Sequence, residues 1–88
     1  MKNLFKNAIN FYENKEYDKA KKVCEDILDI QPDDLNATNL LAILNFHNKD
    51  FVQSIKFFEK AIEINPNISE TYNNLGNVYY EFKQFNTA

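Results

Sequence analysis

The sequence repeats at a fixed interval of 34 residues, and this interval constrains the fold more than any other feature. Pro32 and Pro66 are one interval apart, and the same shift aligns the aromatic residues Tyr17, Phe51 and Phe85. A constant period of this length is typical of solenoids, in which each unit is one supersecondary element that stacks on the next. The shift also aligns three lysines and three small residues, namely Lys15, Lys49, Lys83, Ala8, Ala42 and Gly76.

Each period contains two segments in which apolar residues recur at helical spacing. In the first unit they are separated by the short link 14–16, a usual length between antiparallel helices. We expect Asn14 and Asn48 to adopt the left-handed conformation that ends a helix. Pro32 and Pro66 should then stop the second helix of each unit. The pattern predicts helices at 3–13, 16–30, 35–47, 50–64 and 69–82, with a sixth beginning near 84.

The segment 35–47 is apolar on nearly every side, unlike the other predicted helices. A helix of this kind needs neighbours on several faces, and in a stack the middle unit has a neighbour on each flank. Acidic Asp33 and Asp34 precede this helix, where a helix N-terminus favours them. Asp50 and Gln53 have the capping-box spacing at the start of the next helix. The apolar pattern and the repeat therefore predict the same arrangement.

The third unit carries the most specific motif. Tyr72-x-x-Leu75-Gly76-x-x-Tyr79 resembles the first-helix signature of the tetratricopeptide repeat, with Tyr in place of the usual Trp. The resemblance implies an all-α fold, a right-handed superhelical stack of antiparallel helix hairpins of the α-α solenoid kind. It implies repeats at 1–34 and 35–68 and a truncated third repeat at 69–88, with its first helix and the start of its second.

The first two units fit the same family pattern with a few departures. Asn45 stands where the other units carry Phe11 and Tyr79, and Ser54 replaces a small alanine. Cys24 replaces the aromatic residue of the second unit's Phe58 column. We expect these departures to weaken local packing and to leave the architecture intact.

The composition weighs against several classes of function. The formal net charge is -3, the pI is about 5.0 and every cation is Lys, so we expect no nucleic-acid partner. No apolar run approaches the length of a membrane span, so we expect no membrane association. The single Cys24 cannot form an intrachain disulfide, which favours a reducing, cytoplasmic setting.

Residues that could carry chemistry are few. One histidine, His47, and one cysteine cannot complete a multi-ligand metal site. The sequence shows no nucleophile and base pair, phosphate loop or dinucleotide motif. We therefore expect no enzymatic activity, no cofactor and no metal.

The family resemblance implies that the first helices of the units line a concave groove. Aromatic side chains there could anchor a peptide or partner helix, and Asn side chains could both donate to and accept from its backbone. An alternative is that the apolar members only pack between units, that the Asn residues are ordinary solvated positions, and that the histidine is simply exposed near a helix end. The candidate partner-binding residues are Phe5, Ile9, Tyr12, Asn39, Ile43, Phe46, His47, Asn73, Asn74, Asn77 and Tyr80.

These observations predict a protein-protein interaction scaffold. The alternative is a non-catalytic helical appendage or self-assembly region of a larger enzyme or multidomain protein. A third unit without its second helix would leave Leu75, Val78, Tyr79 and Phe82 uncovered, so we expect self-association through this uncapped C-terminal end.

Overall fold

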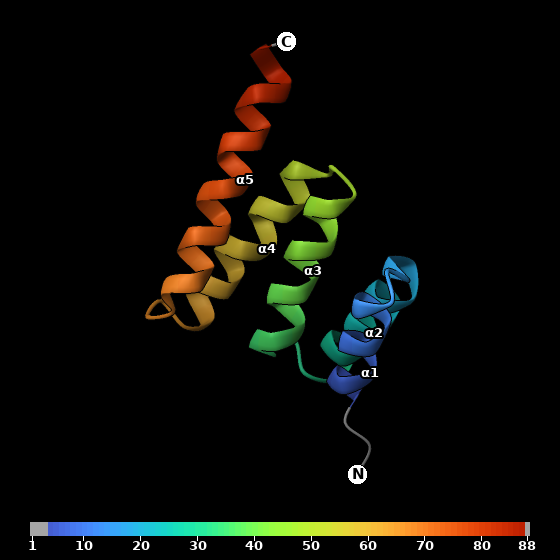
Figure 1. Ribbon diagram of the computed structural model, residues 1–88. Helices are drawn as coiled ribbons and strands as arrows, with labels where there is room; N and C mark the ends of the chain where they lie inside the picture. The colour runs from blue at the N-terminus through green and yellow to red at the C-terminus, as the bar shows by residue number, and fades with distance from the viewer. Residues whose placement is uncertain (1–3, 88) are drawn as a thin grey trace.

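The computed structural model describes the backbone of residues 4–87 and the side chains of residues 4–84. It contains five α-helices joined by short links (Figure 1). Residues 1–3 and 88 lie outside this description, as does the side chain of Phe85. The helices are α1 (Leu4–Glu13), α2 (Tyr17–Ile30), α3 (Leu35–His47), α4 (Phe51–Ile64) and α5 (Ser69–Thr87).

The all-α solenoid of stacked hairpins is confirmed. α1 packs on α2 and α3 packs on α4, and the two hairpins join where α2 contacts α3. The last helix, α5, packs mainly on α4 and touches α3. The first four helices begin and end within one residue of the predicted bounds, because the apolar columns and the two prolines mark both ends of each helix.

Both hairpin turns close in the same way, with a left-handed lysine. Lys15 has φ 62° and Lys49 has φ 63°, so the prediction that Asn14 and Asn48 take this conformation was wrong by one residue. In the first turn the Glu16 amide donates to the carbonyl of Phe11 at 2.8 Å. The Lys15 amide donates to the carbonyl of Tyr12 at 3.0 Å, and the second turn repeats both bonds. This is a Schellman motif, which satisfies carbonyls that the helix end leaves unpaired.

Acidic residues cap the second hairpin at both helix starts, as the sequence indicates. The Asp34 carboxylate accepts a hydrogen bond from the Ala37 amide at 2.8 Å at the start of α3. The Asp50 carboxylate accepts one from the Gln53 amide at 3.3 Å at the start of α4. Each bond satisfies a donor that the first turn of a helix cannot pair internally.

The core consists of two clusters that meet at α3. The first lies between α1, α2 and α3 and includes Ala8 and Cys24, both fully buried. The second lies between α3, α4 and α5 and includes Ala42 and Phe58. The central helix α3 is therefore buried from both sides, as its apolar composition predicts. Ser54 adds to the second cluster, because its hydroxyl donates to the carbonyl of Ala42 at 2.7 Å across the α3–α4 contact.

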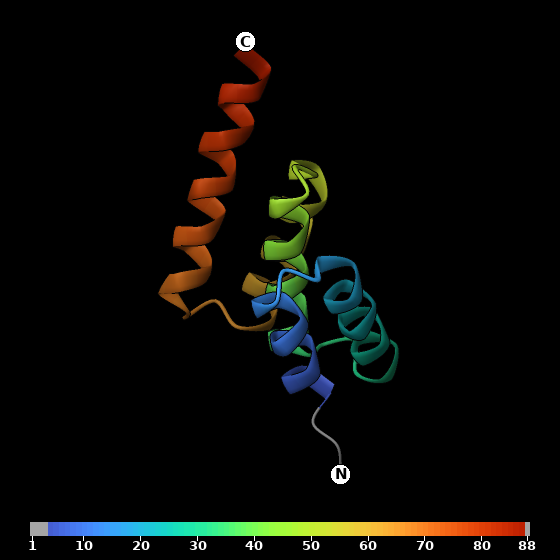
Figure 2. The ribbon, with the colours of Figure 1, turned by 45° about the vertical axis from the view of Figure 1, so that its right-hand side comes forward.

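The last helix differs from the prediction. α5 continues through Thr87, so the second helix expected near residue 84 does not begin there. In both ribbon views the C-terminal part of α5 extends past the other helices as a straight rod (Figures 1 and 2). Gly76 is also unlike its counterparts Ala8 and Ala42: it is exposed, and a Cβ atom there would meet nothing within 4 Å. Among the described residues, none packs closely on this position, although it aligns with two buried alanines.

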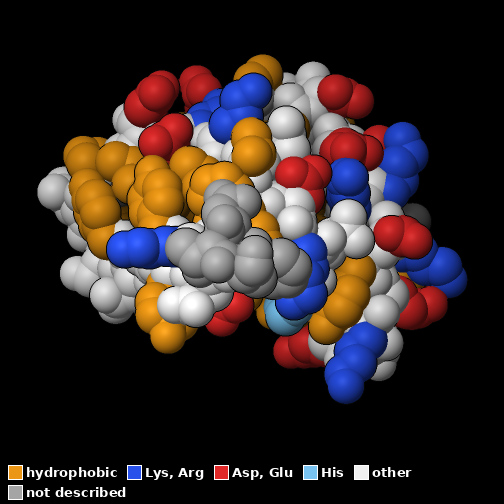
Figure 3. Space-filling model, turned by 90° about the horizontal axis from the view of Figure 1, so that it is seen from above, with side chains coloured by type: hydrophobic (Ala, Val, Ile, Leu, Met, Phe, Trp, Pro, Cys, Tyr) orange, Lys and Arg blue, Asp and Glu red, His pale blue; other side chains and the backbone are white. Residues whose placement is uncertain are grey.

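The expected uncovered face of α5 is only partly exposed. Val78 is buried in the second cluster, and Leu75 and Phe82 pack against that cluster. The prediction that these three residues are uncovered was therefore wrong. Tyr72, Tyr79 and Tyr80 are exposed. Seen from the end where α5 stops, hydrophobic side chains gather toward the α5 side, and charged side chains dominate the opposite side (Figure 3).

Candidate functional site

A cavity of about 300 Å³ lies where the first helices of the three units meet. α1 contributes Tyr12, α3 contributes Ile43, Phe46 and His47, and α5 contributes residues of its N-terminal half. These helices are far apart in the sequence, and only the stacking of one hairpin on the next brings them together. We call this cavity the groove; it is lined by Tyr12, Ile43, Phe46, His47, Phe58, Glu70, Asn74, Asn77 and Val78.

The wall of the groove at α1 and α3 is a cluster of rings. The Tyr12 hydroxyl and His47 Nε2 lie 3.1 Å apart and form a hydrogen bond whose direction depends on the histidine tautomer. The Tyr17 ring stacks on the His47 ring, with centroids 5.0 Å apart and planes 7° from parallel. Partial burial, with a smaller contribution from Tyr17, raises the pKa of Tyr12, so its phenol stays protonated at neutral pH. These contacts hold His47 in place although its position at the end of α3 is exposed.

The floor of the groove is apolar and rigid. Phe58 and Val78 are each only 1% exposed and line it from below. Phe46 packs edge to face against Phe51, with ring centroids 5.9 Å apart, and this contact fixes the orientation of its ring. An apolar side chain entering the groove would therefore meet a preformed surface rather than one it must order.

The rim of the groove on α5 is polar. Asn74 and Asn77 lie one turn apart on one face of the helix, and each amide can donate and accept hydrogen bonds. Glu70 contributes the one carboxylate among the described lining residues, and the lining contains no lysine. The groove thus combines an aromatic floor with hydrogen-bonding amides and a negative charge.

The structure gathers six of the eleven candidate residues in the groove and places the other five elsewhere. Phe5 and Ile9 pack against the first core cluster, as the alternative interpretation of apolar packing expected. Asn39 is partly buried, and its Oδ1 atom is enclosed without a hydrogen-bond partner among the described residues. Asn73 and Tyr80 are exposed on α5, away from the groove lining.

Three groove residues stand outside the list of candidates, namely Phe58, Glu70 and Val78. Phe58 was assigned only to packing, since a second helix does not face a concave surface in a simple helical projection, and Val78 was expected at an uncovered end. Phe58 reaches the groove because α4 lies directly beneath the contact between α3 and α5. Helical spacing predicts which residues of one helix line the walls of such a site. Which residues form the floor depends on how the helices stack, and the spacing within one helix does not show this.

The cysteine has a structural environment. Cys24 is fully buried in the first core cluster, as expected for a thiol that packs like a small hydrophobe. Burial, with smaller contributions from Asp34 and Glu25, raises the pKa of the Cys24 thiol to about 12. The reactive thiolate form is therefore suppressed at neutral pH.

Two statements about metal sites and membrane spans hold for the part of the chain that the structure describes. Among those residues, no group of three or more His, Cys, Asp or Glu side chains could hold a metal ion. Along the same residues, no helix combines the length and apolar character that crossing a bilayer requires.

Stacked helical hairpins with a groove built from their first helices define an α-helical repeat protein. Comparison with known families agrees with this class, because sequence models described as tetratricopeptide repeat match residues 36–68 and 57–88. The chain belongs to the tetratricopeptide repeat family. This repeat is a non-catalytic unit, and proteins that contain it act generally as scaffolds for protein partners.

Curated relatives match the chain over short stretches of much longer proteins. The chain is 31% identical over 88 residues to UDP-N-acetylglucosamine--peptide N-acetylglucosaminyltransferase of Caenorhabditis elegans, a match that covers 100% of this chain and 8% of the relative. It is 36% identical over 70 residues to human Superkiller complex protein 3, covering 78% of this chain and 4% of the relative. Tetratricopeptide repeat protein 37 of Xenopus laevis is 27% identical over 84 residues, covering 96% and 5%. The chain therefore spans less than a tenth of the length of each of these relatives.

Proposed function

We propose that this chain is a protein-interaction module whose groove holds one segment of a partner, either an extended peptide or a helix. The observation that carries the proposal is the groove itself, an apolar-floored cavity of about 300 Å³ to which all three first helices contribute. An anchor side chain of the partner enters between Phe46 and Val78. Asn74 and Asn77 bind the partner's backbone, since their amides stand beside that entrance.

The charge of the groove indicates which class of partner segment binds there. Glu70 is a carboxylate at the rim and no lysine lines the cavity, so a neutral or basic segment binds better than an acidic one. Proteins rather than nucleic acids are the partners, because the chain carries a net charge of -3. A cytoplasmic setting belongs to the same proposal, since the single thiol of Cys24 is buried and needs no oxidising compartment.

Selection of binding peptides from a displayed random library, followed by fluorescence anisotropy on the purified chain, tests this proposal. We expect Phe46→Ala to weaken binding of a selected peptide by about thirtyfold, the size of an interface hot spot. Asn77→Ala should weaken it by about threefold to tenfold through the loss of a hydrogen bond. Asn73→Ala is the matched control, because it removes the same side chain from the same helix outside the groove. Selected peptides that bind both groove variants as tightly as the unchanged chain would rule the groove out.

A second candidate function is that of a non-catalytic appendage within a larger enzyme or multidomain protein. The observation in its favour is that the chain matches 8% of a relative whose name is that of a glycosyltransferase. The sequence of the full gene product distinguishes the two candidates. A catalytic domain in the same polypeptide would support the appendage, and a polypeptide made only of repeats would contradict it.

Self-association is a further part of this second candidate. Tyr79 and Tyr80 leave 47% and 64% of their surface exposed on α5, where they form part of an aromatic face. We expect analytical ultracentrifugation at high concentration to show a dimer that Tyr80→Ser weakens. Ile30→Ser is the control, because Ile30 is an apolar residue on α2 that is 71% exposed, slightly more than Tyr80. A monomer at all concentrations would refute association through α5.

A further inference from the structure

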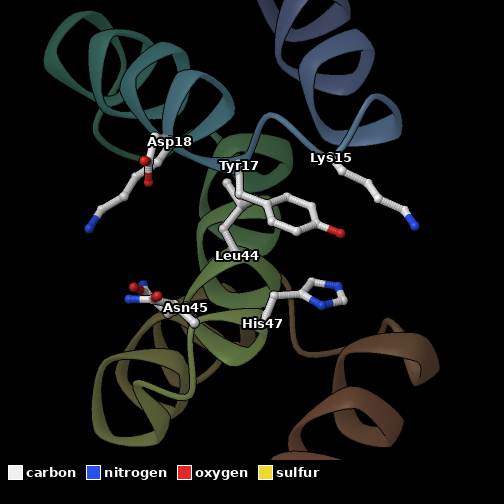
Figure 4. A pocket seen from close by; sticks show the side chains of 8 residues that line it. Lys15, Tyr17, Asp18, Leu44, Asn45 and His47 are labelled. Carbon is white, nitrogen blue, oxygen red and sulfur yellow. The ribbon is translucent and has the colours of Figure 1, made fainter.

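A second cavity, of about 240 Å³, lies beside the groove and shares His47 with it. It opens between the turn that joins α1 to α2, the first turn of α2 and the last turn of α3. Leu44 and the Tyr17 ring form its apolar side, and the remaining lining is mostly polar. Figure 4 shows Lys15 on one side of the cavity and Asp18 and Asn45 on the other, with Tyr17 and His47 nearer Lys15.

The cavity lies next to a departure from the repeat. Asn45 occupies the column in which the other units carry Phe11 and Tyr79. It is only 4% exposed, so this unit holds a short amide at a buried position, whereas the ring of Phe11 is partly buried and Tyr79 is 47% exposed. A shorter side chain at a buried position leaves space beside it, and a polar space of this size is filled by water or by a ligand.

Asn45 lines the cavity although only 4% of the residue is exposed. Among residues 4–84 the enclosed side-chain polar atom without a partner is Oδ1 of Asn39 and not an atom of Asn45. A carboxylate in the cavity can accept a hydrogen bond from the Asn45 amide. Asn48, one turn further along at the end of α3, adds a second amide to the same cavity.

The charges around the cavity favour an anion. Lys15 and Lys21 line its edge, and neither forms an ion pair with any residue that the structure describes, whereas Lys19 and Lys22 are paired with Glu16 and Asp26. Asp18 is the one carboxylate in the lining, so two cations face one anion in a molecule whose net charge is -3. The left-handed backbone at Lys15 is fixed by the Schellman motif, which places the base of this side chain at the cavity edge.

We propose that this cavity binds the carboxylate side chain of an acidic polypeptide segment. The amides of Asn45 and Asn48 donate to the carboxylate oxygens, and the ammonium groups of Lys15 and Lys21 close over it from the rim. The stacked rings of Tyr17 and His47 pack against its aliphatic stem. A volume of about 240 Å³ accommodates one such side chain and not a folded element.

The cavity and the groove therefore select opposite charges on the two sides of one histidine. The groove presents the carboxylate of Glu70, and the second cavity presents two lysines. His47 contacts Tyr12 in the groove wall and Tyr17 in the cavity wall. The carboxylate site stands independently of the groove, since its binding groups, Asn45, Asn48, Lys15 and Lys21, lie outside the groove lining.

Titration of the isotopically labelled chain with a blocked triglutamate peptide, followed by NMR, tests the proposal. We expect the Asn45 side-chain amide signals to shift in a saturable way, together with ring signals of Tyr17. The matched triglutamine peptide should produce no saturable shift, because it lacks the carboxylate. Asn45→Phe, which restores the repeat's aromatic residue, should weaken triglutamate binding by about tenfold or more.

Two lysine variants separate the cavity from the general charge of the molecule. Lys21→Gln removes a cation that lines the cavity, and Lys22→Gln removes its neighbour, which faces Asp26 instead. We expect the first to weaken triglutamate binding by about threefold to tenfold and the second to leave it unchanged. Equal losses in both variants would show long-range charge and overturn the site.

Other results also overturn it. An equal response to triglutamine would mean that no carboxylate is recognised, and an equal or stronger response to inorganic phosphate would mean a general anion site. Full binding by Asn45→Phe, with circular dichroism showing a folded chain, would exclude the cavity. If Asn45→Phe fails to fold, Asn45→Ala removes the same amide without adding volume, and unchanged binding by that variant would exclude the cavity equally.

Discussion

The two closed hairpins and α5 use the same position of the repeat in opposite ways. Lys15 and Lys49 end α1 and α3 in the left-handed conformation, and each chain turn is closed by the same pair of backbone hydrogen bonds. Lys83, one further interval along, lies inside α5, which continues to Thr87. Lysine at this repeat position therefore ends a helix in the first two units and lies within a continuous helix in the third.

The difference shows that these turns depend on tertiary contacts more than on the local sequence. A non-glycine residue in the left-handed region costs about 1 kcal/mol, and lysine has no side-chain feature that compensates for it. In the first two units the second helix supplies the compensation by burying residues such as Ala20 and Phe58 against the first. Beside Gly76 no described residue makes such a contact, and there the favourable choice is a straight helix.

The largest effect on the free energy of unfolding comes from comparing a buried aromatic residue of the closed hairpins with an exposed one on α5. Phe58→Ala removes a ring that is 1% exposed between α3, α4 and α5, and we expect a loss of about 3–5 kcal/mol in the free energy of unfolding. Tyr79→Ala on the open face should cost less than about 1 kcal/mol, since half of that residue already contacts solvent. Urea unfolding followed by circular dichroism measures both. Similar losses would mean that α5 is as tightly packed as the closed hairpins.

Most of the fold could be predicted because the same pattern of apolar residues and helix-ending residues recurs in each repeat. The apolar columns at Ala8 and Ala42 and the two prolines each mark a helix that the structure confirms. The left-handed residues were predicted one position early, at Asn14 and Asn48. Asparagine has only a weak intrinsic preference for that conformation, and the hydrogen-bond pattern of the whole turn decides which residue takes it.

The groove could be predicted in part, for a similar reason. Helical spacing places Ile43, Phe46 and His47 on one face of α3, and the structure keeps them together. Phe5 and Ile9 were assigned to the same surface, but α1 turns that face toward the first core cluster. The cavity at Asn45 was not predicted, because a departure from the repeat shows that a side chain is missing and gives no indication of what lines the resulting space.

A smaller effect contrasts the small residues of the two regions. Gly76→Ala should raise the free energy of unfolding by about 1 kcal/mol, because alanine favours the helix and its Cβ meets nothing within 4 Å. Ala42→Gly, at the equivalent buried position, should lower it by about 1 kcal/mol or more through lost helix propensity and lost packing. Urea midpoints at equal slope measure the pair. Destabilisation by Gly76→Ala would indicate that another element of the protein, such as a second copy, packs closely on this face.

The smallest expected effect tests the lysine column directly. Lys15→Gly should raise the free energy of unfolding by about 0.5 kcal/mol, because glycine adopts φ near 62° without strain and part of that gain is offset by greater freedom of the unfolded chain. Lys83→Gly should lower it by about 0.5 kcal/mol, since glycine there disfavours a helix, and only its last turn follows this position. Thermal unfolding of the two variants beside the unchanged chain shows whether each substitution raises or lowers the stability. If Lys83→Gly were instead stabilising, the third unit would prefer a turn at this position in solution, and the contrast between the closed hairpins and α5 would disappear.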